Sequence, residues 1–201
     1  MIDLENPAVK DFLETFKDKL SQSVRYPAFA LLIQELSKRE NPLIVETGTA
    51  RWKDNWIGDG QTTLIWDWYI SKYGGEAWSV DIDLKYVENA SSQISKVHCV
   101  CSDSISFLRR FAEPERIDLL FLDSYDWGDT LKERSLSELH HIGELACVYE
   151  RLRPGTIIAV DDCHSYDMGK HVMVRTFFDR LGCYPIYPDY IGIWIKPDIQ
   201  I

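Results

Sequence analysis

Short apolar runs alternate with amphipathic stretches along most of the chain. The apolar runs have the length of buried strands and cover residues 43–47, 77–83, 97–103, 117–124 and 156–162. The stretches between them have helical spacing and cover residues 62–73, 85–94, 104–112 and 137–152. Such alternation is typical of a parallel sheet with helices on both faces. The pattern therefore predicts an α/β, Rossmann-like, doubly wound fold.

The beginning of the chain departs from this alternation because it is helical throughout. Phe12, Phe16 and Leu20 recur at four-residue spacing, and a second apolar helical stretch follows Pro27. We therefore expect residues 1–41 to form an N-terminal helical cap or lid.

The end of the chain also departs from the alternation. A predicted helix over 171–182 precedes two strand-like segments, 184–188 and 191–197. The two residues between these segments are too few for a parallel crossover. The core, residues 42–201, should therefore be a mostly parallel, seven-stranded sheet that ends in an antiparallel hairpin.

Composition narrows the class of partner. With 201 residues, 45% of them hydrophobic, the chain can bury one core, so we expect a single domain over 1–201. A formal net charge of −10 argues against nucleic acid and anionic membranes, which require concentrated Lys and Arg. No apolar stretch has the length of a membrane span, and the N-terminus lacks the pattern of a signal peptide, so a cytoplasmic location is expected. The five cysteines form no paired CxxC clusters and are expected to be free thiols. The predicted partner is a small molecule.

The carboxyl end of every predicted strand of the parallel part carries polar or acidic residues. They are Glu46 with Gly48, Asp81 with Asp83, Asp103, Asp123, and Asp161 with Asp162. One such residue could merely cap the next helix. In open α/β sheets, however, ligands bind outside the carboxyl ends of the strands, so the series predicts a ligand site there.

The first strand end carries two glycine-containing segments, 46–49 and 60–63. Their glycines allow close backbone approach, and Thr62 is suited to cap the next helix. Neither GxGxxG nor a phosphate loop is present, which argues against a triphosphate. Asp81 is placed to bind both hydroxyls of a ribose, and Asp103 with Ser104 could contact an adenine edge.

These segments together resemble the class I S-adenosylmethionine-dependent methyltransferases over residues 42–197. The resemblance lies in five motifs in order: VETGT, SVDID, CSDSISFL, LLFLDS and LRPGTIIAVDD. It implies that S-adenosylmethionine is the cofactor. The implied cofactor-binding residues are Glu46, Gly48 and Thr49 at the methionine part, Asp81 at the ribose, Asp103 and Ser104 at adenine, together with Gly60, Thr62 and Asp123.

Residues 51–59 are an insertion relative to the short glycine loop of that family. One hypothesis is that this loop arches over the methionine end, with Trp52 and Trp56 in the acceptor pocket. The alternative is a surface loop whose tryptophans pack on neighbouring helices, as buried aromatic residues commonly do.

A second constellation consists of Asp123, Asp161 and Asp162. Carboxylates from two adjacent strand ends can converge on a hard divalent cation. This set resembles the metal site of magnesium-dependent O-methyltransferases, and the resemblance implies that magnesium would hold and acidify an acceptor hydroxyl. In the alternative, Asp161 and Asp162 cap a loop and Asp123 orders a turn.

The general base is not defined by a motif. Catechol-type enzymes carry a lysine three residues after the fourth-strand Asp, but Asp126 stands at that position here. Either His141 or His140 shares a helix face with Glu144, and a histidine oriented by a carboxylate can accept a proton near neutral pH. His164, two residues after the metal motif, is a further candidate. The expected catalytic set is thus His141, His164 and Asp123, although a helix histidine is often structural.

The resulting prediction is an O-methyltransferase, divalent-metal-dependent, that methylates a hydroxyl of a small phenolic or sugar-derived molecule. Five aromatic residues could line its pocket: Tyr125, Trp127, Tyr166, Tyr187 and Tyr190. The N-terminal helices would suit a homodimer contact. Three alternatives are a metal-free methyltransferase acting on oxygen or nitrogen, a scaffold without activity, and an NAD-dependent reductase. The reductase would also use Asp81, but the chain has no YxxxK pair.

Overall fold

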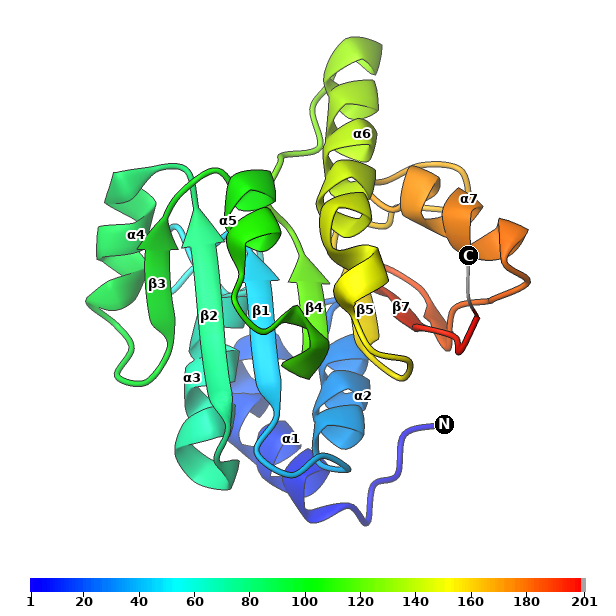
Figure 1. The fold of residues 1–201 in the computed structure, drawn as a ribbon. Helices are drawn as coiled ribbons and strands as arrows, with labels where there is room; N and C mark the ends of the chain where they lie inside the picture. The colour runs from blue at the N-terminus through cyan, green and yellow to red at the C-terminus, as the bar shows by residue number, and fades with distance from the viewer. Residues whose placement is uncertain (200–201) are drawn as a thin grey trace.

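The computed structural model describes residues 1–199, and its centre is one seven-stranded sheet (Figure 1). The strand order is β3-β2-β1-β4-β5-β7-β6. The strands are β1 (Leu43–Thr47), β2 (Glu76–Asp81), β3 (His98–Cys101), β4 (Ile117–Leu122), β5 (Ile157–Val160), β6 (Tyr187–Pro188) and β7 (Gly192–Ile195). Strands β1 to β5 are parallel, and β7 is antiparallel to both β5 and β6. The predicted Rossmann-like sheet and its closing hairpin are confirmed.

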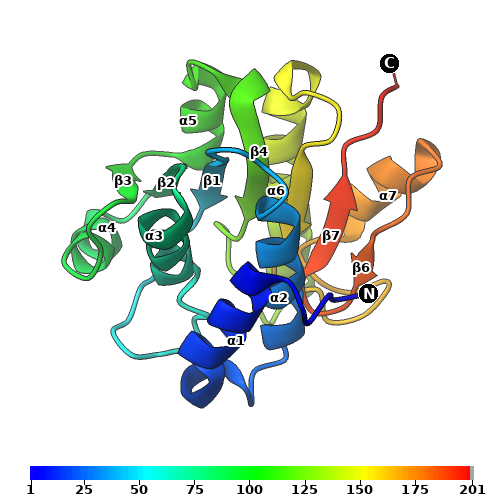
Figure 2. The same ribbon diagram turned by 90° about the horizontal axis from the view of Figure 1, so that it is seen from below.

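Helices cover both faces of this sheet (Figure 2). Helices α1 (Pro7–Leu20), α2 (Tyr26–Leu36) and α3 (Thr62–Tyr73) share a hydrophobic cluster with one face. Helices α5 (Ser104–Arg110), α6 (Leu131–Val148) and α7 (Val172–Arg180) share a cluster with the other. Helix α4 (Leu84–Ser91) lies beside β2 and β3. None of the helices within residues 1–199 is both long and apolar enough to span a membrane.

Side chains of the central strands alternate between the two clusters. Ile44, Leu119 and Phe121 belong to the cluster of α1, α2 and α3. Val45 and Leu120, one residue away, belong to the opposite cluster. This period of two follows from strand geometry. It explains why strands buried on both faces are apolar throughout.

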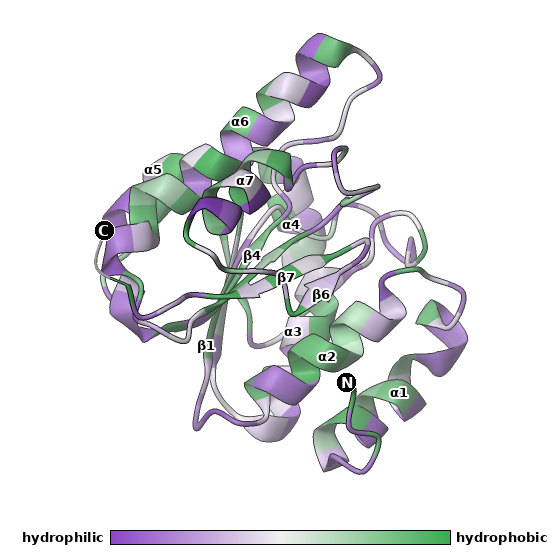
Figure 3. Ribbon diagram, turned by 90° about the vertical axis from the view of Figure 1, so that its right-hand side faces the viewer, coloured by the Kyte–Doolittle hydropathy of each residue, from purple (hydrophilic) through white to green (hydrophobic). Residues whose placement is uncertain are grey.

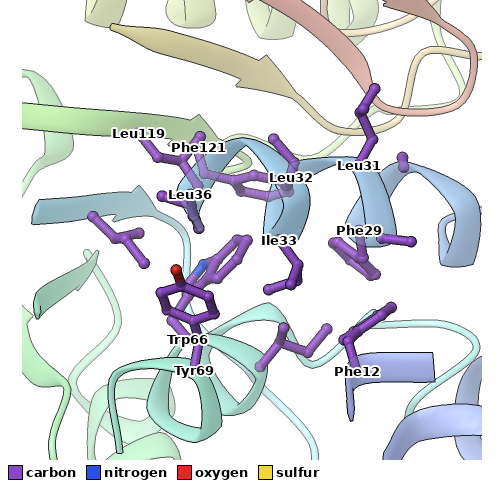
Figure 4. Packing of buried hydrophobic residues seen from close by; sticks show 14 of the residues in the cluster. Phe12, Phe29, Leu31, Leu32, Ile33, Leu36, Trp66, Tyr69, Leu119 and Phe121 are labelled. Atoms are coloured by element: carbon purple, nitrogen blue, oxygen red, sulfur yellow. The ribbon is translucent and has the colours of Figure 1, made fainter. Parts of the chain in front are cut away.

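Helix α2 is part of the core. Phe29, Leu32 and Ile33 are fully buried, and Phe29 packs near Trp66 of α3 and Phe121 of β4 (Figure 4). Helix α2 is largely hydrophobic, whereas α1 outside it combines hydrophobic and hydrophilic residues (Figure 3). The expected N-terminal helical cap therefore covers one face of the sheet. Because α2 leads through a short turn into β1, its first turn lies at the carboxyl ends of the strands.

One helix start and one helix cap differ from expectation. Helix α6 begins at Leu131, before the predicted residue 137, because Thr130 and Glu133 form a capping box. Thr62 does not cap α3, because the cap position is Gln61, in a left-handed conformation with φ of 54°. The expectation for Thr62 is thus corrected by one residue.

Candidate active site

Two adjoining hollows form a cleft at the carboxyl ends of β1, β2 and β4, called here the strand-end cleft. One hollow, of about 210 Å³, includes Gly48, Thr49 and Asp123 in its lining. The other, of about 340 Å³, includes Asp103 and Ser104. Asp81, Ile82 and Ser124 line both hollows. Six of the nine residues predicted to bind the cofactor therefore line one continuous surface: Gly48, Thr49, Asp81, Asp103, Ser104 and Asp123.

Gly48 allows the turn after β1 to pass close to the end of β4. Its φ is +83°, and a Cβ at this position would collide with the backbone carbonyl of Asp123. Backbone hydrogen bonds continue the pairing beyond the strands, from Gly48 N to Val80 O at 2.8 Å and from Asp123 N to Thr47 O at 2.9 Å. Only glycine combines this conformation with this approach.

Asp81 lies between the two hollows. Its Oδ2 accepts a hydrogen bond from Thr49 N at 3.3 Å, and its Oδ1 accepts one from Asp83 N at 2.9 Å. Burial raises the pKa of this carboxyl group. Its position fits the ribose role that the sequence predicts.

Asp103 and Ser104 line the outer hollow, where the sequence predicts adenine. Asp103 also caps α5, because its Oδ1 accepts a hydrogen bond from Ser106 N at 2.8 Å. Ser104 Oγ lies 3.0 Å from Nε2 of His140, which lines the same hollow. His140 is therefore at the predicted adenine end of the cleft.

Glu46 lies beneath the cleft and does not line it. Its Oε2 accepts hydrogen bonds from Thr63 Oγ1 at 2.7 Å and from Ser79 Oγ at 2.6 Å. Burial raises the pKa of Glu46 to about 8. Thr63 Oγ1 also accepts a hydrogen bond from Ala50 N at 2.9 Å, so Glu46 holds the turn after β1 from below.

Sequence reasoning selected Thr62, but Thr63 is the residue that makes these bonds. The two threonines are neighbours at the start of α3, and the spacing of the motif does not indicate which of them points toward Glu46. Thr62 is buried at the start of α3, and Gly60 packs beside the side chain of Arg25. Neither Thr62 nor Gly60 lines the strand-end cleft.

The inserted loop is held by Asp59. Its Oδ2 accepts hydrogen bonds from Arg51 N at 2.7 Å and Trp52 N at 3.3 Å. Trp56 is buried against Phe16 of α1, with 5.5 Å between the ring centroids. This packing corrects the hypothesis that Trp56 lines an acceptor pocket.

Trp52 occupies a different environment from Trp56. It is half exposed, and its ring centroid lies 5.6 Å from that of Tyr86, which lines the strand-end cleft. The loop thus has one tryptophan packed in the core and one near the cleft.

Asp123, Asp161 and Asp162 converge at the ends of β4 and β5, as the sequence predicts, but two cations lie among them. Lys170 Nζ is 2.5 Å from Asp123 Oδ1 and 3.0 Å from Asp162 Oδ2. Arg25 donates from Nε to Asp161 Oδ2 at 2.8 Å and from Nη2 to Asp162 Oδ1 at 2.9 Å. These five residues are called the acid–base cluster.

The cations of this cluster stay charged at neutral pH. Lys170 is 1% exposed, and burial alone would lower the pKa of its ammonium group, but Asp123 and Asp162 raise it. Burial would likewise raise the pKa of Asp162, whereas the charges of Lys170 and Arg25 lower it. Two cations of the chain thus form ion pairs with the three carboxyl groups, and burial raises the pKa of the third acid, Asp123, to about 8.

This arrangement does not fit the predicted magnesium site. A divalent cation needs free carboxylate oxygens, and the Lys170 ammonium lies against two of the three expected ligands. Across residues 1–199 no group of three His, Cys, Asp or Glu side chains is arranged to hold a metal ion. Arg25 is 136 residues from Asp161 in the chain, so no local motif could have indicated the pair.

His141 has no solvent exposure and does not line the cleft. Its Nδ1 lies 2.7 Å from the carbonyl oxygen of Ser137, one turn earlier in α6. Burial lowers the pKa of His141 to about 4. The expectation that His141 is the base is corrected, because a general base must reach its substrate.

His164 lies on the other side of the acid–base cluster. Its ring is 5.4 Å from that of Tyr190 and 5.9 Å from that of Trp127, measured between centroids. It lines a separate cavity, together with Tyr166. Among the predicted catalytic residues, Asp123 alone lines the strand-end cleft.

Comparison with solved structures finds methyltransferases of the same fold. MycE from the mycinamycin biosynthetic pathway, in complex with Mg and SAH, has a TM-score of 0.62 and 14% identity over 97% of this chain, which spans 57% of the MycE chain. An O-methyltransferase from Bacillus cereus, in complex with SAH, has a TM-score of 0.55 and 15% identity, covering 96% of this chain and 92% of that one. A Plasmodium falciparum protein described as a ribosomal RNA methyltransferase has a TM-score of 0.57 and 11% identity, covering 87% of this chain and 96% of that one.

No protein-family model and no curated protein sequence matches the chain. At these identities the structural comparisons show the fold. They confirm that the chain resembles class I methyltransferases in fold, and they include two SAH-bound examples that cover nearly the whole chain.

Proposed function

We propose that this chain, which has the class I methyltransferase fold, transfers a methyl group from S-adenosylmethionine to a hydroxyl of a small molecule. The observation that carries the proposal is the strand-end cleft. It brings Gly48 and Thr49 to one end, Asp81 to the middle, and Asp103 with Ser104 to the other. This order matches the methionine, ribose and adenine parts of the cofactor. The fold alone would be a weaker argument, because one fold supports many chemistries.

The residues of the cleft fit this cofactor chemically. The carboxylate of Asp81 can accept hydrogen bonds from ribose hydroxyls, and the backbone after Gly48 is open to the methionine end. When bound, S-adenosylmethionine supplies an electrophilic methyl group. The part of this chain is to orient cofactor and acceptor and to accept the acceptor's proton.

Asp123 is the predicted catalytic residue best placed for that proton. It lines the hollow that contains Gly48 and also belongs to the acid–base cluster. Its ion pair with Lys170 orients the carboxylate at the methionine end. The general base is therefore proposed to be Asp123.

We propose that methyl transfer needs no divalent cation, as in the metal-free alternative. Support comes from Lys170 and Arg25, which already form ion pairs with all three carboxyl groups predicted to bind magnesium. The magnesium ion in the MycE complex is an observation about MycE and is not carried over to this chain. The chemistry at this cluster is accordingly assigned to side chains of the chain itself.

A small acceptor is favoured over RNA. MycE has also been solved with mycinamycin VI, whereas another protein of this fold is described as a ribosomal RNA methyltransferase. The net charge of −10 would repel a polyanion. The hydroxylated acceptor is thus proposed to be a small molecule, phenolic or sugar-derived.

The experiment is calorimetric titration of the purified protein with SAH and, separately, with NAD. We expect saturable SAH binding that weakens at least about tenfold in Asp81→Asn, because a ribose contact is lost. Glu88→Gln, an exposed change on the neighbouring helix α4, is the matched control and should bind normally. A folded wild-type protein that binds NAD but not SAH would reject the methyltransferase proposal in favour of a reductase.

A further inference from the structure

A second cavity lies between α7, the loop after β5 and the β6–β7 hairpin, and is called the α7 cavity. Its volume is about 420 Å³, which is within the range of small-molecule sites. It shares no lining residue with the strand-end cleft. Its residues are therefore not explained by the proposed cofactor site.

Three side chains that line this cavity have buried nitrogen atoms without a hydrogen-bond partner in residues 1–199. The atoms are Arg175 Nε and Nη1, His171 Nδ1 and Trp194 Nε1. His171 is 6% exposed and Trp194 1% exposed. Buried polar groups nearly always have partners, and an unpaired one costs about 1–3 kcal/mol. Three in one cavity point to a ligand.

All three groups can donate hydrogen bonds. The guanidinium and the indole are donors only, and His171 Nδ1 donates in one of its neutral tautomers. Burial lowers the pKa of His171 to about 4, so its ring is neutral under ordinary conditions. A partner with acceptor oxygens can therefore satisfy all three groups.

The charge of Arg175 narrows the class of ligand. Its guanidinium carbon lies 3.5 Å from the ring centroid of Tyr166, and within the described residues it forms no ion pair. Asp179 and Asp189 also line the cavity, but Asp179 accepts a hydrogen bond from the Tyr166 hydroxyl and Asp189 from Tyr190 N. The unpartnered Nε and Nη1 lie on different edges of the guanidinium, so they would donate to separate acceptor oxygens, and the positive charge favours an anionic partner such as a carboxylate or phosphate.

Much of the remaining lining is apolar. Trp194 stacks on Phe178 at an interplanar angle of 10°, and Pro185 and Pro188 come from the hairpin. An apolar lining suits an aromatic body. An inorganic ion would leave most of this surface without contact.

We propose that the α7 cavity binds a small organic anion, with its carboxylate or phosphate on Arg175, His171 and Trp194 and its aromatic body against the apolar lining. The cavity is also linked to the acid–base cluster. His164 lines the cavity and packs on Tyr190, whose hydroxyl donates to Asp162 Oδ1 at 2.7 Å. We therefore place here the anionic end of the acceptor, a step that rests on the proposed function.

The test uses the indole N–H signals of ¹⁵N-labelled full-length protein. The chain has seven tryptophans, and Trp194→Phe identifies the signal of Trp194. The protein is titrated with benzoate, phenyl phosphate and benzamide, which share a ring and differ in the charged group. We expect one of the two anions to shift the Trp194 signal saturably at millimolar concentration, and benzamide to bind at least about tenfold more weakly.

Variants separate the site from the fold. Arg175→Gln should weaken binding of the anion at least about tenfold, whereas Arg180→Gln, an exposed change on the same helix, should not. If Arg175→Gln fails to fold, Arg175→Lys, which keeps the charge but loses the separate Nε and Nη1 donors, should still bind more weakly than wild type. The stronger anion identifies a carboxylate or a phosphate ligand.

Three results would overturn the proposal: equal binding of benzamide, equal binding by folded Arg175→Gln, or no shift with either anion up to about 20 mM. The titration is run with and without SAH. Anion binding by a protein that does not bind SAH would keep the anion site and remove only its assignment to a methyl acceptor. SAH binding without anion binding would keep the methyltransferase and reject the anion site.

Discussion

At the scale of residues, Lys170 shows how a buried charge can be stabilised by the fold. Its ammonium is out of contact with water and lies between Asp123 and Asp162. Burying an ion is costly unless ion pairs and hydrogen bonds compensate. Arg25 performs the same role for Asp161. Removal of either cation would leave carboxylates buried without compensation, and such a site should attract another cation.

Lys170→Ala is therefore expected to create a divalent-cation site that the wild-type protein lacks. Titration with Mn²⁺, followed by electron paramagnetic resonance, should show at least about tenfold tighter binding to the variant than to wild type. Lys170→Arg keeps a cation in place and should behave like wild type. Adding Asp123→Asn to Lys170→Ala should abolish the new binding.

The control is Lys132→Ala, which removes an exposed lysine from α6. Tight Mn²⁺ binding by wild type, unchanged in Lys170→Ala, would mean that the lysine moves aside and that the predicted magnesium site is real. Chelator treatment of the wild-type protein should leave methyl transfer unaffected.

Glu46 should make stability depend on pH. Its pKa is raised from 4.5 to about 8, so the folded state binds the proton more tightly than the unfolded state. The resulting stabilisation is complete below about pH 4.5 and is lost as pH rises through about 8. Between pH 5 and pH 8, this proton should lower the free energy of unfolding of the wild-type protein by roughly 3–4 kcal/mol, measured by urea unfolding. In Glu46→Gln this part of the decrease should be absent. Glu88→Gln should retain the wild-type dependence, and an unchanged slope in Glu46→Gln would reject the buried proton.

At the scale of elements, the carboxylate of Asp59 joins the two ends of the inserted loop. Asp59 holds the amides of Arg51 and Trp52 and also accepts a hydrogen bond from Gln61 Nε2 at 2.7 Å. The loop borders the hollow lined by Gly48. Its conformation should therefore influence the methionine end of the cofactor.

Asp59→Ala should increase amide hydrogen exchange at Arg51 and Trp52 and weaken SAH binding by about three- to tenfold. Asp126→Ala is a matched control, because it also removes a carboxylate from this hollow. Asp126 contacts the side chain of Arg51, however, and not the backbone amides that Asp59 holds. Equal effects of the two variants would show that charge, not loop order, determines affinity.

At the scale of the whole molecule, acidic residues outnumber basic ones by 32 to 22. Two of the basic residues, Arg25 and Lys170, are buried in ion pairs and inaccessible to a partner. A polyanion would find little attraction on such a chain, because protein binding to nucleic acid depends on phosphate contacts from Lys and Arg.

We therefore expect no saturable binding of a labelled RNA of about 20 nucleotides below roughly 100 μM protein at low salt, measured by fluorescence anisotropy. Low salt favours nonspecific electrostatic binding and makes the test stringent. Micromolar binding that weakens steeply with salt would instead favour an RNA acceptor.

The sequence by itself determined the features that depend on local order. Alternating apolar positions predict the strands, and parallel strands bring their carboxyl ends to one edge, so the order of residues alone places Asp81, Asp123 and Asp161 at that edge. The two-residue link before the last strand likewise indicated the hairpin.

Tertiary structure decided which side chains meet. Arg25 pairs with Asp161, 136 residues away in the sequence, and Lys170 pairs with Asp123, 47 residues away. The periodicity of apolar residues carries no information about pairs so far apart in the sequence. On α6, buried His141 directly follows His140, which lines the cleft. Spacing with Glu144 suits either histidine, because neighbours on a helix differ by only about 100° of rotation. The packing of the whole molecule, and not the local pattern, selects between them.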